Sequence, residues 1–235
     1  MKKLLVFLLA VLLLTACTSG ETDNRITPTT VPTEAPTAPS TLPPAPVTVY
    51  PGAVEHYLGW RKGADFSWPR PGPPEIIMLH FCSAVVNHRD DPFNMTYIRQ
   101  IFIDADVSIH YIIDREGTVY CYVPEDRAAW HAGTGMWGDD KYTGSMNLYS
   151  IGIELVGIGS QSDMKSYLSA KAYKALDPSW YGFTDAQYTA LKALVEDICQ
   201  RNNIPMDRQH IIGHEEYNPK KHDPGQLFDW NRLLG

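Results

Sequence analysis

The stretch EIIMLHF, residues 75–81, is the strongest indication of the fold class in this chain of 235 residues. Its apolar run, closed by His80, is typical of a buried β-strand. A second run of the same kind, SIGIELV at residues 150–156, carries a single charged side chain, that of Glu154. The two runs predict buried strands contributed by distant parts of the chain.

Helical spacing of apolar residues predicts one helix before the second strand and one after it. Asn94 is a suitable N-cap for the first, NMTYIRQIFI at residues 94–103. Thr184, with Gln187 three residues later, forms a capping box for the second, which we expect to end near Asn203. The residues predicted to form the apolar faces are Tyr97, Ile98, Ile101 and Phe102 in the first helix, and Tyr188, Leu191, Leu194, Val195 and Ile198 in the second.

A β-hairpin is predicted where two β-rich runs, residues 108–113 and 118–123, are joined by DREG. QHIIG, residues 209–213, predicts a last strand. The order strand, helix, hairpin, strand, helix, strand indicates an α/β fold: a single domain with a central mixed β-sheet flanked by helices. Residues 133–148 and 158–182 are irregular and are expected to form loops or short helices around a site.

The first 16 residues predict a secretory signal peptide. Lys2 and Lys3 give it a basic start, and the apolar run at residues 4–14 is shorter than the roughly 20 residues of a membrane-spanning helix. LTAC, residues 14–17, resembles the lipobox of bacterial lipoproteins, so we expect cleavage before Cys17 and a lipid anchor on that cysteine. An ordinary signal peptide with Cys17 near its end is the alternative.

Residues 17–47 are expected to form a disordered linker after the lipidated cysteine. Seven prolines and eight threonines make up half of residues 18–47, which leaves too little apolar surface to offset the entropy of ordering. At about 3.1 Å per residue, such a segment reaches roughly 90 Å from its anchor. The remainder, residues 48–235, is long enough for one ordinary domain.

Charge and cysteine content restrict the partners and the chemistry. Loss of Lys2 and Lys3 changes the formal net charge from −7 to −9, which argues against nucleic acid as a partner. The domain contains three cysteines, an odd number for an exported chain. Cys82 and Cys121 are able to form a disulfide if their strands are neighbours, whereas Cys199 lies on a helix face and is expected to be a small buried residue.

Histidines at the ends of two predicted strands point to a metal site. His80 follows IIML and His214 follows HIIG, so that each strand would fix an imidazole at the edge of the sheet. Asp223 lies nine residues after His214, and the turn-forming residues that follow it would hold its carboxylate in place. Two histidines and a carboxylate that leave a fourth position open to water are the pattern of hydrolytic zinc. A histidine at the end of a strand is more often structural, and spacing alone leaves both interpretations open.

Five segments, in order, resemble the type 2 N-acetylmuramoyl-L-alanine amidases, a family related to the peptidoglycan recognition proteins. They are IIMLHFCSA (76–84), SIHYIIDREGTVY (108–120), AWHAG (129–133), SIGIELVG (150–157), and IIGHEEYNPKKHDPG (211–225) followed by FDW. The resemblance covers about residues 73–230, and it implies the fold of these amidases and recognition proteins. It also implies hydrolysis, with Zn²⁺, of the amide bond between N-acetylmuramic acid and the L-alanine of the peptidoglycan stem peptide.

The resemblance assigns a role to particular residues. His80, His214 and Asp223 match the zinc ligands of the family. Glu154 matches the acidic residue that takes a proton from the attacking water and passes it to the leaving amine. Lys221 matches a basic residue near the reacting carbonyl, where its charge would stabilise the oxyanion.

Other polar residues near these positions have competing interpretations. His131 in AWHAG is expected to contact the substrate, and Trp130 to line the pocket or pack beside it. Lys220 is the alternative to Lys221 as the active lysine. His222 adjoins Asp223 but should point away from the metal, and a structural role is expected for His110.

Together these features predict an exported amidase of the bacterial cell envelope, held at a membrane by lipid on Cys17 and acting on peptidoglycan or muropeptides. One rival is a peptidoglycan receptor that binds without catalysis. The other is a zinc peptidase that cuts within the stem peptide. The choice between intact wall and anhydro-muropeptide substrates stays open.

Overall fold

The computed structural model describes residues 48–59 and 66–235. Residues Ala45–Gly235 form one compact unit. The predicted signal peptide, Cys17 and the whole predicted linker lie outside the described residues. Within the described part of the chain, no helix combines the length and the apolar character needed to cross a membrane.

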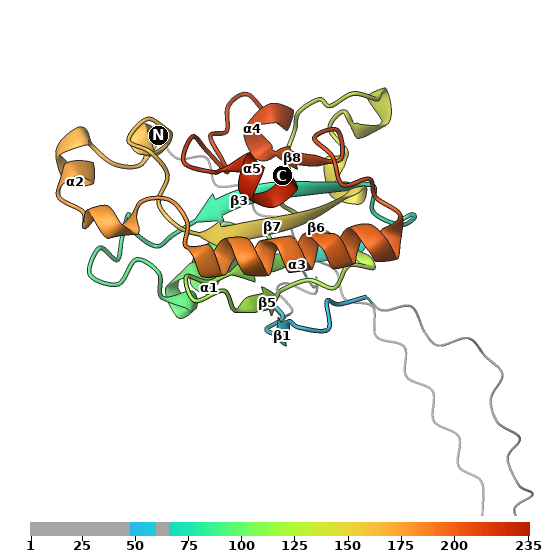
Figure 1. The fold of residues 1–235 in the computed structure, drawn as a ribbon, viewed down its shortest axis with the longest axis horizontal. Helices are drawn as coiled ribbons and strands as arrows, with labels where there is room; N and C mark the ends of the chain where they lie inside the picture. The colour runs from blue at the N-terminus through green and yellow to red at the C-terminus, as the bar shows by residue number, and fades with distance from the viewer. Residues whose placement is uncertain (1–47, 60–65) are drawn as a thin grey trace, which may run out of the picture. The chain divides into compact units, whose positions relative to one another are not determined.

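A six-stranded mixed sheet lies at the centre of the unit, with the strand order β1-β5-β4-β7-β3-β8 (Figure 1). Four neighbouring strands, from β4 to the edge strand β8, run parallel, and β5 pairs with β4 in the antiparallel sense. Because the carboxyl ends of parallel strands meet at one edge, this edge is where an α/β sheet places a site. The strands are β1 (Val54–Glu55), β3 (Ile76–Cys82), β4 (Tyr111–Ile113), β5 (Val119–Cys121), β7 (Ser150–Val156) and β8 (Ile211–Gly213).

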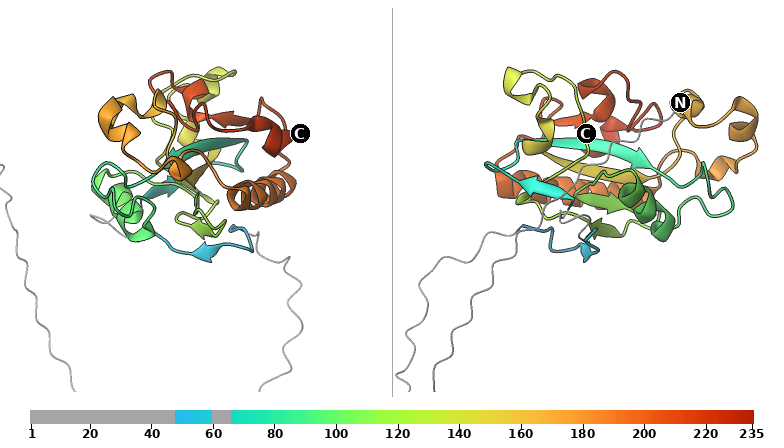
Figure 2. Two further views of the ribbon diagram at one scale, coloured as in Figure 1. Left: turned by 60° about the vertical axis from the view of Figure 1, so that its left-hand side comes forward. Right: turned by 180° about the vertical axis from the view of Figure 1, so that it is seen from behind.

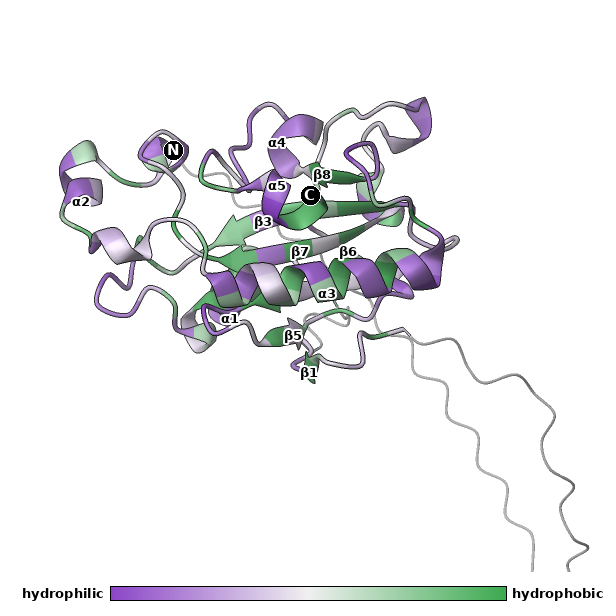
Figure 3. Cartoon of the chain, in the orientation of Figure 1, coloured by the Kyte–Doolittle hydropathy of each residue, from purple (hydrophilic) through white to green (hydrophobic). Residues whose placement is uncertain are grey.

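Two helices cover opposite faces of the sheet, α3 (Asp185–Asn202) one face and α1 (Met95–Asp104) the other (Figures 1 and 2). Side chains of a strand alternate between its faces. Ile77 and Leu79 of β3 therefore pack with α3, whereas Ile98 of α1 packs with the other face of the sheet. The central strands are largely hydrophobic, whereas the visible side of α3 carries hydrophilic residues among hydrophobic ones (Figure 3).

The helix starts follow the sequence closely. Thr184 caps α3 in a complete capping box, and Asn203 ends it in the left-handed conformation. Gln187 has a further role, because its side-chain amide donates to the carbonyls of Ile113 and Val156 at the ends of two strands. One residue therefore both starts the helix and fixes it to the edge of the sheet.

The predicted apolar face of the first helix was wrong at two positions. Ile98 and Phe102 of α1 are buried, but Tyr97 and Ile101 are 38% and 40% exposed. Tyr97 stacks on His88, with ring centroids 3.7 Å apart. The helix covers the sheet with a narrower stripe than its sequence suggests, which leaves Ile101 free to line a pocket.

The shortest elements surround the sheet. β2 (Ser67–Pro69) and β6 (Arg127–Ala129) form a separate antiparallel pair. As predicted, residues 133–148 and 158–182 form loops with short helices. These helices are η1 (Asp140–Tyr142), η2 (Met146–Leu148), η3 (Asp163–Ser166), α2 (Ala170–Lys174) and η4 (Pro178–Trp180), and α4 (His214–Tyr217) and α5 (Trp230–Leu234) complete the chain.

All three cysteines of the domain are free thiols. Cys82 and Cys121 do not pair, because β4 and β7 separate their strands in the sheet. Cys199 is buried among apolar residues, as predicted.

Candidate active site and metal centre

Three parallel strands bring the predicted chemistry to one edge of the sheet. His80 of β3 is the direct register partner of Glu154 of β7. On the other side of β3, Leu79 pairs with Gly213 of β8, so that His214, the next residue, lies beside His80. The imidazole rings of His80 and His214 have centroids 4.5 Å apart.

The loop after α4 (His214–Tyr217) brings the carboxylate of Asp223 next to these two histidines. Its Oδ2 atom lies 2.7 Å from Nδ1 of His80 and 2.9 Å from Nδ1 of His214. The three ligand atoms all lie within 4.8 Å of one another. Two nitrogens and one carboxylate oxygen form the donor set of an open zinc site.

The protonation of His214 fits a metal ligand. Its Nε2 lies 3.0 Å from the carbonyl oxygen of Ala132, which only accepts hydrogen bonds. Nε2 therefore donates this hydrogen bond, which leaves Nδ1 as the nitrogen that faces Asp223 and is available to a divalent metal.

Burial keeps His80 in the neutral form that metal binding requires. It lowers the pKa of His80 to about 4, with further lowering by the charges of His214 and Lys221, while Asp223 opposes the change. Burial alone would raise the pKa of Asp223, but its contacts with His214 and His80 outweigh this and hold the pKa below its ordinary range.

Glu154 is a buried carboxylate, 9% exposed, in the strand next to His80. Its Oε2 atom has no hydrogen-bond partner among the described residues. Burial raises its pKa well above the ordinary value, and the charge of Asp223 raises it further, while a hydrogen bond from Cys82 and the charge of Lys221 lower it. A carboxylate with a free oxygen in this position is suited to exchange protons with a reacting water or amine.

Of the two candidate lysines, Lys221 is electrostatically coupled to the site. Its charge acts on both His80 and Glu154. Both lysines are exposed, and the backbone N–H of Lys220 donates a hydrogen bond to the side-chain oxygen of Asn218. His222 lines a pocket but does not belong to the ligand cluster, as predicted.

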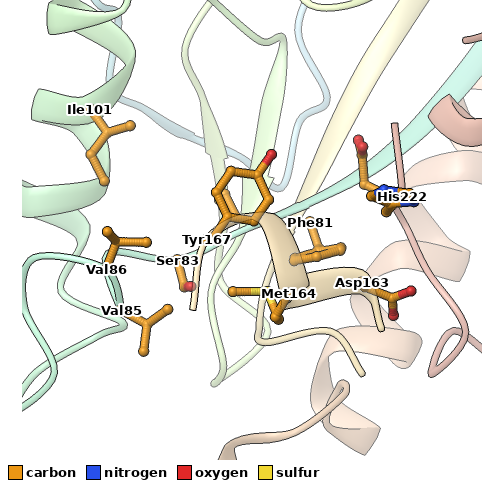
Figure 4. Close-up of a pocket in the computed structure, with 11 residues that line it drawn as sticks. Phe81, Ser83, Val85, Val86, Ile101, Asp163, Met164, Tyr167 and His222 are labelled. Atoms are coloured by element: carbon orange, nitrogen blue, oxygen red, sulfur yellow. The ribbon is translucent and has the colours of Figure 1, made fainter. Parts of the chain in front are cut away.

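A cavity of about 230 Å³ adjoins the candidate metal ligands. Asp223 and Cys82 lie in its wall beside the ligand cluster, and Ile101 of α1 contributes from the far side. Figure 4 shows Met164 and Tyr167 of the 158–182 segment across the cavity from Val85 and Val86. Most of the lining is apolar, so the cavity can hold an uncharged part of a substrate beside the reacting centre.

Comparison with known proteins decides the family. Residues 70–226 match the family model described as N-acetylmuramoyl-L-alanine amidase. The chain belongs to this amidase family. The amidase is 32% identical, over 164 residues, to the 1,6-anhydro-N-acetylmuramyl-L-alanine amidase AmpD of Haemophilus influenzae. The matched region covers 69% of this chain and 75% of that AmpD. It is 28% identical, over 186 residues, to the N-acetylmuramoyl-L-alanine amidase AmiD of Escherichia coli. This matched region covers 76% of this chain and 57% of AmiD.

Solved structures confirm the fold predicted for the amidase. A selenomethionine derivative of AmpD matches with a TM-score of 0.55 and 25% identity, over 80% of this chain and 95% of AmpD. AmiD from E. coli, in complex with anhydro-N-acetylmuramic acid-L-Ala-D-gamma-Glu-L-Lys, matches with a TM-score of 0.50 and 28% identity, over 74% of this chain and 60% of AmiD.

His131 and Trp130, the two residues expected near the substrate, both have defined neighbours in the amidase. His131 is placed behind His80, with its Nδ1 atom 2.9 Å from Nε2 of His80. Trp130 packs between Phe66 and Trp68, with ring centroids 5.9 and 5.7 Å away, and does not line the cavity beside Asp223. The structural role predicted for His110 agrees with its buried hydrogen bonds to Gly152 and Arg127.

Sequence reasoning missed the residues that hold the Asp223 loop of the amidase. Asp163 is buried, and its Oδ2 atom accepts from the backbone of Ser160 and of Gln226, which joins the 158–182 segment to this loop. Glu215 accepts from the backbone of Gly225. Gly225 has φ of +80° and leaves no room for a side chain beside Asp163. In the sequence, Asp163 is only one carboxylate in a polar segment, and nothing in its neighbours indicates that it holds the Asp223 loop.

Proposed function

We propose that this protein is a zinc-dependent amidase that hydrolyses the bond between the lactyl group of N-acetylmuramic acid and the L-alanine of the stem peptide. The observation that carries the proposal is the convergence of His80, His214 and Asp223 within 4.8 Å, beside the buried carboxylate of Glu154. Family membership supplies the substrate class. A recognition module that only binds would have no need for this combination.

The residues divide the work of amide hydrolysis. A zinc ion held by His80, His214 and Asp223 would supply Lewis-acid polarisation and bring the pKa of water towards about 7. Glu154 accepts a proton from the attacking water, and its raised pKa suits it to deliver that proton to the amide nitrogen as the C–N bond breaks. Lys221 places a positive charge near the oxyanion of the tetrahedral intermediate.

The products of digestion test this function directly. The purified protein with zinc is incubated with an anhydro-muropeptide and, separately, with intact peptidoglycan, and the products are separated by chromatography. The proposal expects an intact stem peptide with a free amino group on L-alanine, and the released sugar. Cuts between amino acids would instead identify a peptidase, and bound but unaltered substrate would identify a receptor.

We expect Lys221→Ala to lower kcat by about 10²–10³, the usual effect of losing one group that stabilises an oxyanion. Lys220→Ala is the matched control, because it removes the same charge from an exposed side chain one position earlier in the loop. Steady-state kinetics on a muropeptide measures both variants. Equal losses in the two would reassign the effect to the general charge of the loop.

We also propose that the protein is exported and held at the cell envelope by lipid on Cys17. The support is the LTAC sequence and the Pro/Thr-rich segment after it, whose reach would let an anchored enzyme meet a polymer at a distance. Cys17→Ala in the full chain is expected to move the protein from the membrane fraction to the soluble exported fraction. Unchanged membrane association of this variant would count against the anchor.

A further inference from the structure

A row of hydrogen bonds runs from the metal centre into the sheet behind it. Nε2 of His80 lies 2.9 Å from Nδ1 of His131, and Nε2 of His131 lies 3.1 Å from the hydroxyl oxygen of Ser150. The Ser150 hydroxyl in turn lies 2.7 Å from the carbonyl oxygen of Met146. Ser150 is fully buried at the start of β7.

The last contact sets the direction of all the others. The carbonyl of Met146 only accepts, so the single hydroxyl proton of Ser150 is donated to it. Ser150 must then accept from His131, which places the proton of His131 on Nε2. The bare Nδ1 of His131 accepts from Nε2–H of His80. Nδ1 of His80 is left without a proton, facing Asp223.

The ring of His131 is held so that this direction is kept. Its backbone N–H and that of Ala132 both donate to the side-chain oxygen of Asn147, at 3.0 and 2.8 Å. The ring packs against Gly152 of β7, where a Cβ atom would lie 2.7 Å from two of its atoms. Residues 150, 152 and 154 point to the same side of the strand. One face of β7 thus contains the Ser150 hydroxyl, the space for His131 and the catalytic carboxylate.

We propose that Ser150 is a positioning residue of the metal centre, which acts through His131 to fix His80 in the tautomer that can bind a cation. In the opposite arrangement His131 carries its proton on Nδ1, and His80 must carry its own on Nδ1. His80 would then donate to Asp223, and an internal hydrogen bond would replace the ligand pair. The hydroxyl of Ser150 thereby decides whether His80 and Asp223 can bind a cation or form a hydrogen bond with each other.

Zinc affinity, measured by chelator competition without substrate, tests the proposal separately from the proposed function. We expect Ser150→Ala to weaken zinc binding by about 10–100-fold, as is typical when a residue behind a metal ligand is lost. Ser108→Ala is the matched control, because Ser108 is also buried and bonds both a carbonyl and a backbone N–H, those of Phe66 and Trp130. It should keep the affinity of the wild type.

A second variant separates tautomer control from loss of packing. His131→Asn places an acceptor oxygen near the position of Nδ1 and needs no help from Ser150, so it should bind zinc better than His131→Leu. Adding Ser150→Ala to His131→Asn should then have little further effect, which makes the two sites strongly non-additive. Additive losses, or a zinc affinity of Ser150→Ala equal to that of the control, would overturn the proposal.

The ¹⁵N NMR shifts of the imidazole of His131 give a readout that does not depend on any variant folding. Spectra of the wild-type protein, with and without zinc, distinguish a proton on Nε2 from one on Nδ1. The proposal expects Nε2–H in both states. An Nδ1–H tautomer of His131 in the zinc-loaded protein would refute it.

Discussion

Glu154→Gln is expected to lower kcat by a factor of about 10²–10⁴, the usual contribution of a positioned general acid–base group, while zinc stays bound. Glutamine has nearly the same shape as glutamate but cannot take a proton from water. The three ligand atoms belong to other residues, so the metal centre should survive. Burial, and then the charge of Asp223, raise the pKa of Glu154, so a neutral amide in its place should not weaken the fold.

A matched control is available within the same domain. Glu125 is also a buried glutamate, but it pairs with Arg201 and accepts from the hydroxyl of Tyr111, away from the site. Glu125→Gln should destabilise the protein, because it leaves the buried charge of Arg201 less well paired, yet kcat of the folded enzyme should hardly change. Kinetics, zinc content and thermal unfolding of both variants are compared. A near-normal kcat for Glu154→Gln would remove its assigned role.

Much of the fold could be predicted because strong local signals agree with the tertiary structure. β7 has the predicted bounds, and α3 starts at the predicted capping box and ends at Asn203. In these segments the apolar pattern and the capping residues favour the same structure as the packing. Weak local signals failed instead: β1, β2 and β6 have only two or three residues each, and such strands exist through their pairing partners.

The sequence indicated those parts of the site that depend on the type of side chain, but not those that depend on backbone atoms or on packing. A metal site could be suggested from two histidines at the ends of apolar runs, His80 and His214, and the nearby carboxylate of Asp223. Spacing alone left a structural role open, and the resemblance to the amidase family assigned the roles, including that of Glu154. The carbonyl of Ala132 that orients His214 could not be, because a backbone atom leaves no trace in residue type. His131 contacts His80, and its expected contact with the substrate stays a prediction. Its position depends on the space above Gly152, which only the folded strand reveals.

His214→Ala is expected to abolish both zinc binding and activity, which distinguishes it from Glu154→Gln. It removes one of three ligands, and the remaining Nδ1 of His80 and Oδ2 of Asp223 cannot enclose a cation alone. The loss of zinc affinity should therefore exceed the 10–100-fold typical of residues behind a ligand. A ligand that binds only the folded state stabilises it, by about 2.7 kcal/mol when present at 100 times its Kd. Added zinc should raise the melting temperature of the wild type and leave that of His214→Ala unchanged.

His222→Ala is the control for this experiment, because it removes an imidazole next to Asp223 that lies outside the ligand cluster. Its melting temperature should still rise with zinc. Removal of the metal from the wild type by a chelator should reproduce the inactivity of His214→Ala, and added zinc should restore the wild type alone. If the chelated enzyme kept its activity, or if His222→Ala and not His214→Ala lost its response to zinc, the ligand set would be different. The positioning role proposed for Ser150 would then fail as well, since it requires Nδ1 of His80 to meet a cation and not a proton.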